Sequence, residues 1–396
     1  MRVLVASTAG AGHFGPIVPF LQALGRRRDD VLVVGPPSLE AAVASTNHRF
    51  RMGAEPPAHE QAAIWERFSS APREETSGLI DRELFGRLCT AAMLPTMEAA
   101  CHDWQPDLVV REASEYASAV AAERGGVPHV QVAISLAEIE ASVIALVAAV
   151  LRPYGAGVVE QLLASPYLTP FPPSLDPSPF STTWRWRAAP AVRPQPLPDW
   201  WGGATGPLVY VTFGSVTGRL PIAVPTYRAA LDAVAGLPAR VLLTLGRAAD
   251  VSALGSVPPN VHVEAWVPQG DVFAEAAAVV CHGGSGTTFG TLAAGVPLVI
   301  VPLFADQPVN GRLVAAAGAG VLLEPEPEAT GAMAGLGPHD ARRLRTAIES
   351  VLADGSYRRA AEGIADELGA LPTVDELLAT VAREVAGASR ECSEHP

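Results

Sequence analysis

Short apolar runs alternate with amphipathic stretches along the first third of this 396-residue chain. The apolar runs that predict strands cover residues 2–7, 31–35, 107–110 and 129–134. A helical pattern begins near Pro16, and residues 55–105 carry further amphipathic helical stretches. Because buried strands that alternate with helices form parallel sheets with both faces covered, the pattern predicts a doubly wound α/β domain.

The same alternation starts again in the second half of the chain. Helices are predicted over 222–235 and 338–385, and strands over 208–213, 240–245, 260–264, 278–281, 297–301 and 320–323. A chain of 396 residues is too long for one ordinary core. We therefore expect an α/β protein of two Rossmann-like domains that face each other. Ligands of such folds bind at the carboxyl ends of the strands, so the interdomain cleft is the expected site.

Composition changes between the two halves. Residues 166–207 hold 11 of the 36 prolines together with Trp184, Trp186, Trp200 and Trp201. Proline removes a hydrogen-bond donor and fixes φ, so this stretch is not expected to form a helix or a central strand. It predicts a connector whose tryptophans are pinned to one domain. The expected domains are 1–205, with a proline-rich linker from about 166, and 206–396, whose terminal helix packs back on the first domain.

The net charge and the cysteine pattern indicate which classes of partner are disfavoured and which cellular compartment is expected. The 28 basic and 41 acidic residues give a net charge of −13, which disfavours nucleic acid and anionic membrane surfaces as partners. The longest apolar run, Val143–Leu151, is far short of the roughly 20 residues that span a bilayer. The four cysteines form no C-x-x-C pair, and the chain begins with a strand instead of a signal peptide. A cytoplasmic protein without a disulfide framework is expected.

The loop after the first strand contains Gly10, Gly12 and Gly15, which match the dinucleotide pattern G-x-G-x-x-G. A nicotinamide dinucleotide site also needs an acidic residue at the end of the next strand. That strand ends with Gly35, Pro36 and Pro37, which disfavours the dehydrogenase interpretation. The loop instead presents His13, whose ordinary pKa near 6.5 suits a general base. The alternative is a histidine that satisfies the backbone of the loop.

The strongest pattern lies within residues 266–307. It opens with Trp266-Val-Pro-Gln and closes with Asp306-Gln307. Between them a buried strand leads into His282-Gly-Gly284-Ser285-Gly286-Thr287 and a helix. Backbone N–H groups at a helix N-terminus form an anion site without any lysine, and this chain contains none. Each residue also has a simpler interpretation: an N-cap for Ser285, Thr287 or Asp306, and a buried aromatic for Trp266.

Taken together, these motifs resemble the family 1 glycosyltransferases of the GT-B fold, and most of all the bacterial enzymes that decorate antibiotics and enediynes. The segment Gly12-His13-Phe-Gly15-Pro16 resembles the family's N-terminal loop, and Thr212-Phe-Gly214-Ser215 the start of its second domain. Residues 266–307 resemble its nucleotide-sugar signature. The resemblance implies an enzyme, a hexosyltransferase of natural-product biosynthesis.

The resemblance also implies roles for individual residues. Trp266 would stack on the nucleotide base, and the Val267 backbone would read its edge. The donor diphosphate would be held by Ser215, His282, Gly284, Gly286 and Thr287. Gly12 and Ser285 would also belong to the donor site. Asp306 and Gln307 would bind the sugar hydroxyls. His13 would be the catalytic base.

The carboxylate that orients the base follows the third strand in this family. Here Glu112 and Glu115 both occur, and Glu112 matches better. Plant relatives carry a Glu eight residues after the signature His, where it binds both ribose hydroxyls, whereas this chain has Gly290. The loss of that ligand favours a deoxyribose, and hence a dTDP-sugar over a UDP-sugar.

The expected reaction is a single inverting displacement that needs no metal and no cofactor, because no clustered carboxylates accompany the donors. The acceptor would be a small hydrophobic molecule bound among Trp65, Phe68, Met93 and Ile139. Packing in a core is the alternative for these side chains. Two other functions compete: a sugar-nucleotide epimerase or hydrolase, and a catalytically silent partner of another transferase. A monomer or a homodimer is expected.

Overall fold

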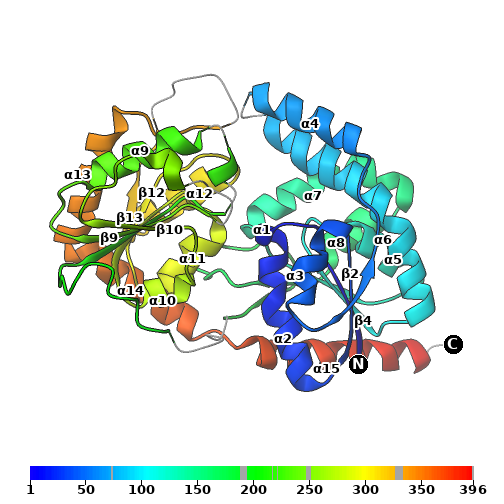
Figure 1. The fold of residues 1–396 in the computed structure, drawn as a ribbon. Helices are drawn as coiled ribbons and strands as arrows, with labels where there is room; N and C mark the ends of the chain where they lie inside the picture. The colour runs from blue at the N-terminus through cyan, green and yellow to red at the C-terminus, as the bar shows by residue number, and fades with distance from the viewer. Residues whose placement is uncertain are drawn as a thin grey trace. The chain divides into compact units, whose positions relative to one another are not determined.

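The computed structural model describes residues 1–72, 75–187, 194–215, 217–220, 222–246, 251–325 and 333–394, and Figure 1 draws it as a ribbon. The chain forms two compact units. The first contains Met1–Ala189 together with Leu371–Pro396, and the second is the continuous segment Pro190–Ala370. The first continuous segment of the first unit therefore ends before the expected boundary at residue 205. The C-terminal segment from Leu371 also belongs to this unit.

A parallel sheet of seven strands forms the centre of the first unit, in the order β3-β2-β1-β4-β5-β6-β7. The strands are β1 (Arg2–Ala6), β2 (Asp30–Gly35), β3 (Arg49–Met52), β4 (Leu108–Glu112), β5 (His129–Val132), β6 (Tyr167–Thr169) and β7 (Thr183–Arg185). Strand β1 is buried between β2 and β4, with Leu4 aligned with Leu32 and Val109. The order reverses at β1 and β4, so the loops that follow these two strands meet at a topological switch point.

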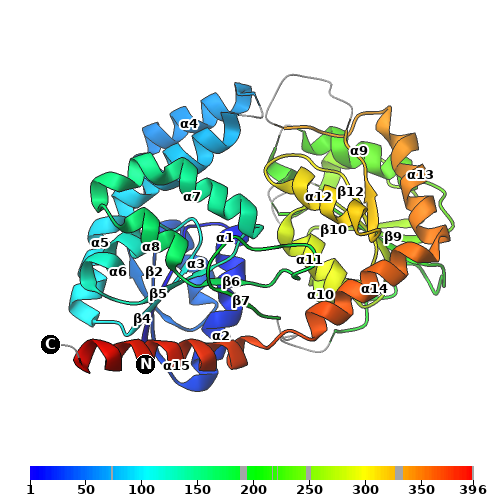
Figure 2. The ribbon, with the colours of Figure 1, turned by 180° about the vertical axis from the view of Figure 1, so that it is seen from behind.

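Helices cover both faces of this sheet (Figures 1 and 2). They are α1 (Ala11–Phe14), η1 (Gly15–Ile17), α2 (Val18–Arg27), η2 (Pro37–Leu39), α3 (Glu40–Ala44), α4 (Ala58–Ser70), η4 (Gly78–Cys89), α5 (Thr90–Trp104), α6 (Ala117–Gly125), α7 (Ala137–Leu151), η5 (Arg152–Tyr154), α8 (Val158–Ala164) and α15 (Val374–Glu394). The apolar run Val143–Leu151 belongs to α7. Among the residues that the structure describes, no helix has both the length and the apolar character of a membrane span.

The last helix, α15, crosses α2 and packs against it, as both ribbon views show. Its side chains Val374, Leu377, Leu378 and Val381 are buried in the same core cluster as Phe20 and Leu24 of α2. An ion pair between Arg26 and Asp375 spans 2.6 Å at the edge of this contact. The end of the chain therefore completes the core of the first unit.

The proline-rich segment corrects two expectations. It contributes strands β6 and β7, and β6 is an inner strand of the sheet. This is possible because β6 fits between Pro166 and Pro170, so its own residues keep their N–H groups. The tryptophans are not pinned to one domain: Trp186 packs edge-on against Phe20 in the first unit, whereas Trp200 stacks on His262 in the second.

The second unit is built around a parallel sheet of six strands in the order β10-β9-β8-β11-β12-β13. The strands are β8 (Leu208–Thr212), β9 (Arg240–Thr244), β10 (Val261–Glu264), β11 (Ala276–Cys281), β12 (Leu298–Ile300) and β13 (Gly320–Leu322). The helices are η6 (Thr217–Arg219), α9 (Ala223–Val234), η7 (Val251–Leu254), α10 (Gln269–Phe273), α11 (Ser285–Ala293), α12 (Gln307–Ala316), α13 (Asp340–Ala353) and α14 (Gly355–Gly369). Here the order reverses at β8 and β11, whose following loops carry Ser215 and His282.

Candidate active site

His13 lies on a short helix that starts immediately after the β1 loop. The helix begins at Ala11, five residues before the predicted start near Pro16. Gly10 caps it with φ of 116°, a conformation that favours glycine, and its carbonyl accepts a hydrogen bond from Phe14 N at 2.9 Å. This turn holds the imidazole at the carboxyl end of the sheet. Gly12 lies beside it on the exposed side of the helix.

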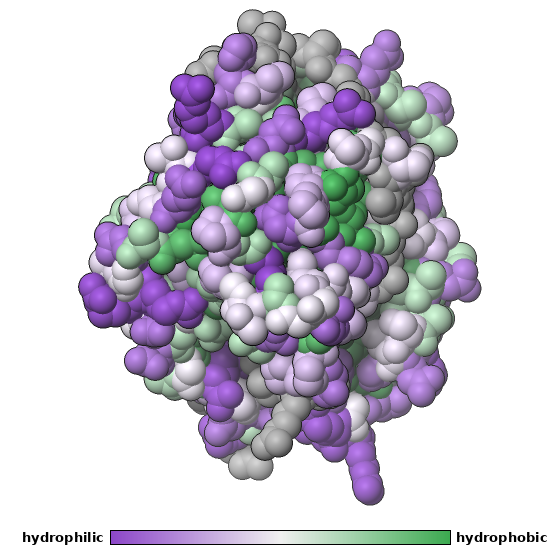
Figure 3. Space-filling model, turned by 60° about the vertical axis from the view of Figure 1, so that its left-hand side comes forward, coloured by the Kyte–Doolittle hydropathy of each residue, from purple (hydrophilic) through white to green (hydrophobic). Residues whose placement is uncertain are grey.

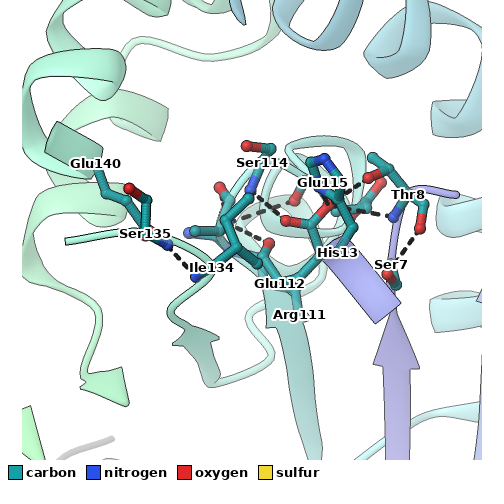
Figure 4. Close-up of polar contacts among 11 residues, drawn as sticks. Ser7, Thr8, His13, Arg111, Glu112, Ser114, Glu115, Ile134, Ser135 and Glu140 are labelled. Atoms are coloured by element: carbon teal, nitrogen blue, oxygen red, sulfur yellow. Dashed lines mark hydrogen bonds and ion pairs between the residues drawn. The ribbon is translucent and has the colours of Figure 1, made fainter. Parts of the chain in front are cut away.

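Glu112, the last residue of β4, contacts His13 directly. The Nδ1 atom of His13 lies 3.2 Å from Oε1 of Glu112, whose side chain is fully buried while that of His13 is 21% exposed. The same Oε1 accepts hydrogen bonds from the Thr8 hydroxyl at 2.6 Å and the Thr8 N–H at 3.2 Å. Oε2 accepts from the N–H of Ser114 at 2.7 Å (Figure 4). Contacts to both oxygens thus fix the orientation of this carboxylate.

The two groups shift each other's pKa in opposite directions. Burial lowers the pKa of His13, but the charge of Glu112, its hydrogen bond and the charge of Asp81 together raise it above its ordinary value. Burial raises the pKa of Glu112, yet His13, Thr8 and the Ser114 N–H together leave it lowered. The pair is therefore a buried carboxylate beside an imidazole that binds a proton more readily than usual.

The other candidate carboxylate, Glu115, does not meet His13. Its Oε2 accepts a hydrogen bond from Ser118 N at 2.9 Å, and burial raises its pKa. The backbone that links the two glutamates is held by the fully buried side chain of Arg111. The sequence analysis did not identify this role. Its Nη1 donates to the carbonyls of Glu112 and Ala113, and its Nη2 to the side chain of Gln131. Arg111 therefore fixes the backbone that carries Glu112.

The neighbouring loop, after β5, is held by another carboxylate. Oε1 of Glu140 accepts hydrogen bonds from Ile134 N at 2.7 Å and Ser135 N at 2.6 Å (Figure 4). Burial raises the pKa of Glu140 well above its usual range. The loops after β1, β4 and β5 are thus each fixed by buried polar side chains at the same edge of the sheet.

In the second unit, His282 follows β11 and leads into the loop before α11. Its Nε2 fills the space beside two glycines: a Cβ on Gly214 or Gly284 would lie 2.7 or 2.6 Å from that nitrogen. Burial lowers the pKa of His282 to about 4, so the ring is neutral near pH 7. Its Nδ1 is buried and has no hydrogen-bond partner within the described part of the chain. A neutral ring of this kind can donate one hydrogen bond without adding a charge.

Gly283 can be only a glycine at this turn. Its φ is 87°, and a Cβ there would lie 2.8 Å from Ile300 Cγ2 and 2.9 Å from the Gln307 carbonyl oxygen. Gly284 is the N-cap of α11 and Ser285 its first residue. This corrects the alternative in which Ser285 or Thr287 caps the helix. The open N-terminal turn, with Gly286 exposed on it, is suited to an anion.

Polar side chains cross-link this turn to its neighbours. The Ser285 hydroxyl lies 3.4 Å from Asp306 Oδ2 and accepts from Asn310 Nδ2 at 3.1 Å. Asn310 also donates to the Gly283 carbonyl at 2.8 Å, a role that the sequence pattern did not reveal. The Thr287 hydroxyl is nearly buried and accepts from Gln269 Nε2 at 3.2 Å. Gln269, the glutamine of the opening motif, is therefore a support for the loop.

Gln307, which is expected to bind a sugar hydroxyl, has a buried side chain. It is 3% exposed, and its Oε1 accepts hydrogen bonds from Leu303 N at 2.8 Å and Phe304 N at 3.0 Å. Its side-chain oxygen therefore shapes the loop after β12. The next turn contains Ala305 with φ of 55°, a left-handed conformation that costs energy for a non-glycine residue. Asp306 occupies the N-cap position of α12 but makes no side-chain capping bond.

The remaining residues expected at a donor site differ in exposure. Trp266 is 48% exposed, which corrects the alternative of a buried aromatic, and Val267 beside it is 8% exposed. Ser215 is exposed after Gly214. Gly290 is covered by an aromatic ring, since a Cβ there would lie 3.1 Å from Phe273 Cε2. The indole of Trp266 and the hydroxyl of Ser215 are thus placed where a ligand can reach them.

Comparison with known proteins places the whole chain. Residues 59–205 match the N-terminal domain, and residues 228–383 the C-terminal domain, of the erythromycin biosynthesis protein CIII-like family. The chain is 32% identical over 388 residues to the L-demethylnoviosyl transferase of Streptomyces niveus, covering 94% of this chain and 95% of the relative. It is 31% identical over 403 residues to the elloramycin glycosyltransferase ElmGT of Streptomyces olivaceus, covering 96% of each.

The chain belongs to the erythromycin biosynthesis protein CIII-like family of glycosyltransferases.

Solved structures agree with this assignment. The glycosyltransferase VinC, crystallised in complex with DTDP, matches 98% of this chain and all of its own with a TM-score of 0.74 and 26% identity. The two parallel-sheet units described above are thus the two domains of a GT-B fold. The expected fold class, the enzyme class and the resemblance to antibiotic glycosyltransferases are confirmed.

The side chains expected to line an acceptor groove in this glycosyltransferase do not all reach the surface. Trp65 on α4 is 47% exposed and meets Phe68 edge-on at 5.5 Å. Ile139 on α7 is half-buried. Met93 is 4% exposed and fills the space beside Gly53, where a Cβ would lie 2.5 Å from its sulfur. Met93 is therefore a core residue, and its place in the predicted groove was wrong.

Three further features of this glycosyltransferase concern its surface, its cysteines and its capacity to bind a metal ion. On the face drawn in Figure 3, hydrophobic residues reach the surface in several places among hydrophilic ones. Cys89, Cys101 and Cys281 are free thiols. Within the described residues, no three His, Cys, Asp or Glu side chains gather in a group that could hold a metal ion.

Proposed function

We propose that this glycosyltransferase moves a sugar from a dTDP-sugar to a hydroxyl of a hydrophobic natural product, with inversion at the anomeric carbon and with His13 as the general base. The observation that carries the proposal is the 3.2 Å contact between the partly exposed His13 and the buried Glu112 at the end of β4. A carboxylate on Nδ1 leaves Nε2 as the nitrogen that meets the acceptor. This is how a general base is oriented in hydrolase triads.

In this mechanism the acceptor hydroxyl gives its proton to Nε2 of His13 as its oxygen attacks the anomeric carbon. The bond from that carbon to the diphosphate oxygen breaks, and its electron pair leaves with dTDP. Glu112 stabilises the imidazolium that results, because an opposite charge at 3.2 Å favours the protonated ring. Attack from the face opposite the leaving group inverts the configuration.

The second unit would hold the donor. The exposed indole of Trp266 would stack on thymine, and the Val267 backbone would bind its edge. Diphosphate oxygens would accept hydrogen bonds from the N-terminal turn of α11, with Ser285, Gly286 and Thr287, and from Ser215 and His282. Asp306 would bind the sugar hydroxyls, with Gln307 beneath it shaping the loop. These neutral donors would stabilise the developing charge without a metal.

The preference for dTDP over UDP is supported by the surroundings of Gly290. A Cβ at Gly290 would lie 3.1 Å from Cε2 of Phe273. A glutamate at this position would therefore require the Phe273 ring to move. An apolar ring would pack well against the C2′ methylene of deoxyribose. It offers no hydrogen-bond partner to the 2′-hydroxyl of ribose, so binding a ribonucleotide would cost the free energy of desolvating that hydroxyl. The presence of DTDP in the VinC crystal structure fits this preference.

Thermal-shift titration of the full chain with dTDP, UDP and NAD tests the donor. A ligand at a hundredfold excess over its Kd stabilises the native state by about 2.7 kcal/mol, which moves the midpoint by several degrees. We expect dTDP to give the largest shift, UDP a smaller one and NAD none. Equal shifts with dTDP and UDP would remove the role of Gly290, and a shift with NAD alone would overturn the proposal.

A transfer assay tests the acceptor class. The enzyme is incubated with dTDP-glucose and a panel of aromatic polyketide and macrolide aglycones, and the products are separated by mass. We expect an aglycone to gain one hexose, with the anomeric configuration opposite to that of the donor. Release of free glucose in the absence of any glycosylated product would instead favour a hydrolase.

A further inference from the structure

A wide helix beside the proposed base carries an aromatic ring that touches it. Phe85 lies on η4, a π-helix of 12 residues, and its ring centroid is 4.9 Å from that of His13 with the two planes tilted by 48°. π-helical segments are rare, are mostly single turns, and occur frequently at functional sites. The wide helix therefore brings an aromatic ring into contact with the imidazole.

The imidazole is constrained from two directions. Glu112 binds its Nδ1 edge, and the Phe85 ring packs against the ring itself. An edge contact alone leaves the imidazole able to swing about that hydrogen bond, and the neighbouring aromatic ring restricts this motion. Tilted and edge-to-face arrangements are the favoured geometries for aromatic ring pairs.

The position of the helix is set by a glycine next to Phe85. A Cβ on Gly86 would lie 3.0 Å from Val147 Cγ1 and 3.1 Å from Val150 Cγ2. A side chain at this position would press against these two valines, so glycine favours the close packing of η4 on α7. On the other side, Leu79, Leu84 and Leu88 are buried in a small apolar cluster with Ile64 of α4. The helix is held by α7 and α4, and Phe85 faces His13.

We propose that Phe85 is a positioning residue for the base: it fixes the plane and tautomer of His13 so that Nδ1 bears the proton donated to Glu112 and Nε2 is left to accept one from the acceptor. The inference rests on the proposed function of His13. Its chemistry is simple, because a histidine free in water prefers the opposite tautomer, with the proton on Nε2. A contact that holds the ring against Glu112 keeps Nε2 unprotonated.

Nitrogen NMR of the full-length enzyme labelled with ¹⁵N-histidine reports the tautomer without any acceptor. The His13 signals are identified by their loss in His13→Ala. Above the pKa of His13 we expect the Nδ1–H tautomer in the wild type and a mixture of both tautomers in Phe85→Leu. Phe85→Tyr keeps the ring and should restore the wild-type signals. Phe50→Leu, which changes a partly buried Phe of β3 in the same unit, is the matched control.

Two further variants make the outcome decisive. Gly86→Ala adds a methyl group that presses on Val147 and Val150 of α7, and it should shift the tautomer in the same direction as Phe85→Leu although Phe85 itself is unsubstituted. Glu112→Ala removes the Nδ1 partner and tests the proposed base pair itself. If Glu112→Ala changes the tautomer but Phe85→Leu and Gly86→Ala do not, the role of Phe85 is overturned and the base remains. If Glu112→Ala changes nothing, the pairing on which both proposals depend is wrong.

With an acceptor from the transfer assay, kinetics add a second readout. Phe85→Leu should lower kcat about tenfold, because misplacement of a catalytic group by a fraction of an ångström already costs rate. The donor KM should stay unchanged, since the proposed donor residues other than Gly12 lie in the second unit. A rise in donor KM with unchanged kcat would contradict a positioning role.

Discussion

Two histidines follow buried strands of the two sheets, and their surroundings differ in charge. His13 after β1 lies against a buried carboxylate that raises its pKa. His282 after β11 lies among glycines, with no charge to oppose burial, and its pKa falls to about 4. One ring is prepared to take a proton and the other to remain neutral. The difference teaches that the neighbours of each histidine, and not the residue type, decide its role.

The largest effect is expected from removing the basic ring. His13→Ala should lower turnover by about two to four orders of magnitude, because general-base catalysis contributes that much. Binding of dTDP should be unchanged in a thermal-shift titration, since the residues proposed to hold the nucleotide, apart from Gly12, lie in the second unit. Near-normal turnover in a well-folded His13→Ala variant would exclude His13 as the base.

Removing the charge that distinguishes the two rings should have the next largest effect. Glu112→Gln is expected to lower maximal turnover about 10²-fold, because the imidazolium loses its ionic partner. A general base must be unprotonated, so turnover rises as pH rises through the pKa of His13. The carboxylate raises this pKa, so its loss should move the acidic limb of the pH–rate profile to lower pH. A limb that stays in place or moves to higher pH would contradict the pairing.

The neutral ring should affect binding and not the pH profile. His282→Ala removes one hydrogen bond to a charged group, which contributes about 1.5–3 kcal/mol, or roughly 10- to 150-fold in dTDP affinity. Because the pKa of His282 is about 4, wild-type dTDP affinity should show no step from this residue between pH 6 and pH 8. Calorimetric titration at several pH values measures both. A step that disappears in His282→Ala would mean that this ring also becomes charged.

The smallest effect is expected at the strained turn of the donor loop. Ala305→Gly removes the cost of a left-handed alanine but gives the unfolded chain more freedom, so stability should rise by about 1 kcal/mol or less. The looser turn should weaken positioning of Asp306 and raise the donor KM a few-fold. Thermal unfolding and donor kinetics measure the two changes. Loss of stability together with unchanged KM would show that the turn has no such role.

Sequence reasoning found the parts of both sites that lie directly after strands. The resemblance to GT-B glycosyltransferases paired His13 with Glu112, and the helix after β11 was expected from the strand and glycines that precede it. Contacts between elements distant in the chain were not found. Phe85 reaches His13 through the packing of η4 on α7, and Asn310 reaches Gly283 from a later helix. No local pattern encodes such contacts.

The errors had the same origin. Met93 has the apolar character expected of a groove residue, but it packs next to Gly53 in the interior. Strand β6 was missed because three residues between prolines carry little pattern of their own, and its neighbours β5 and β7 decide its place. Burial and pairing depend on which elements meet, and that is a property of the whole fold.

The place of α15 in the first unit has a consequence for synthesis. The apolar face of α2 is covered by Leu377, Leu378 and Val381, which leave the ribosome after the entire second unit. Domains usually fold in the order in which they are made. In this enzyme the second unit is one continuous segment that ends at Ala370. It can therefore finish folding before α15, the last helix of the first unit, has been synthesised.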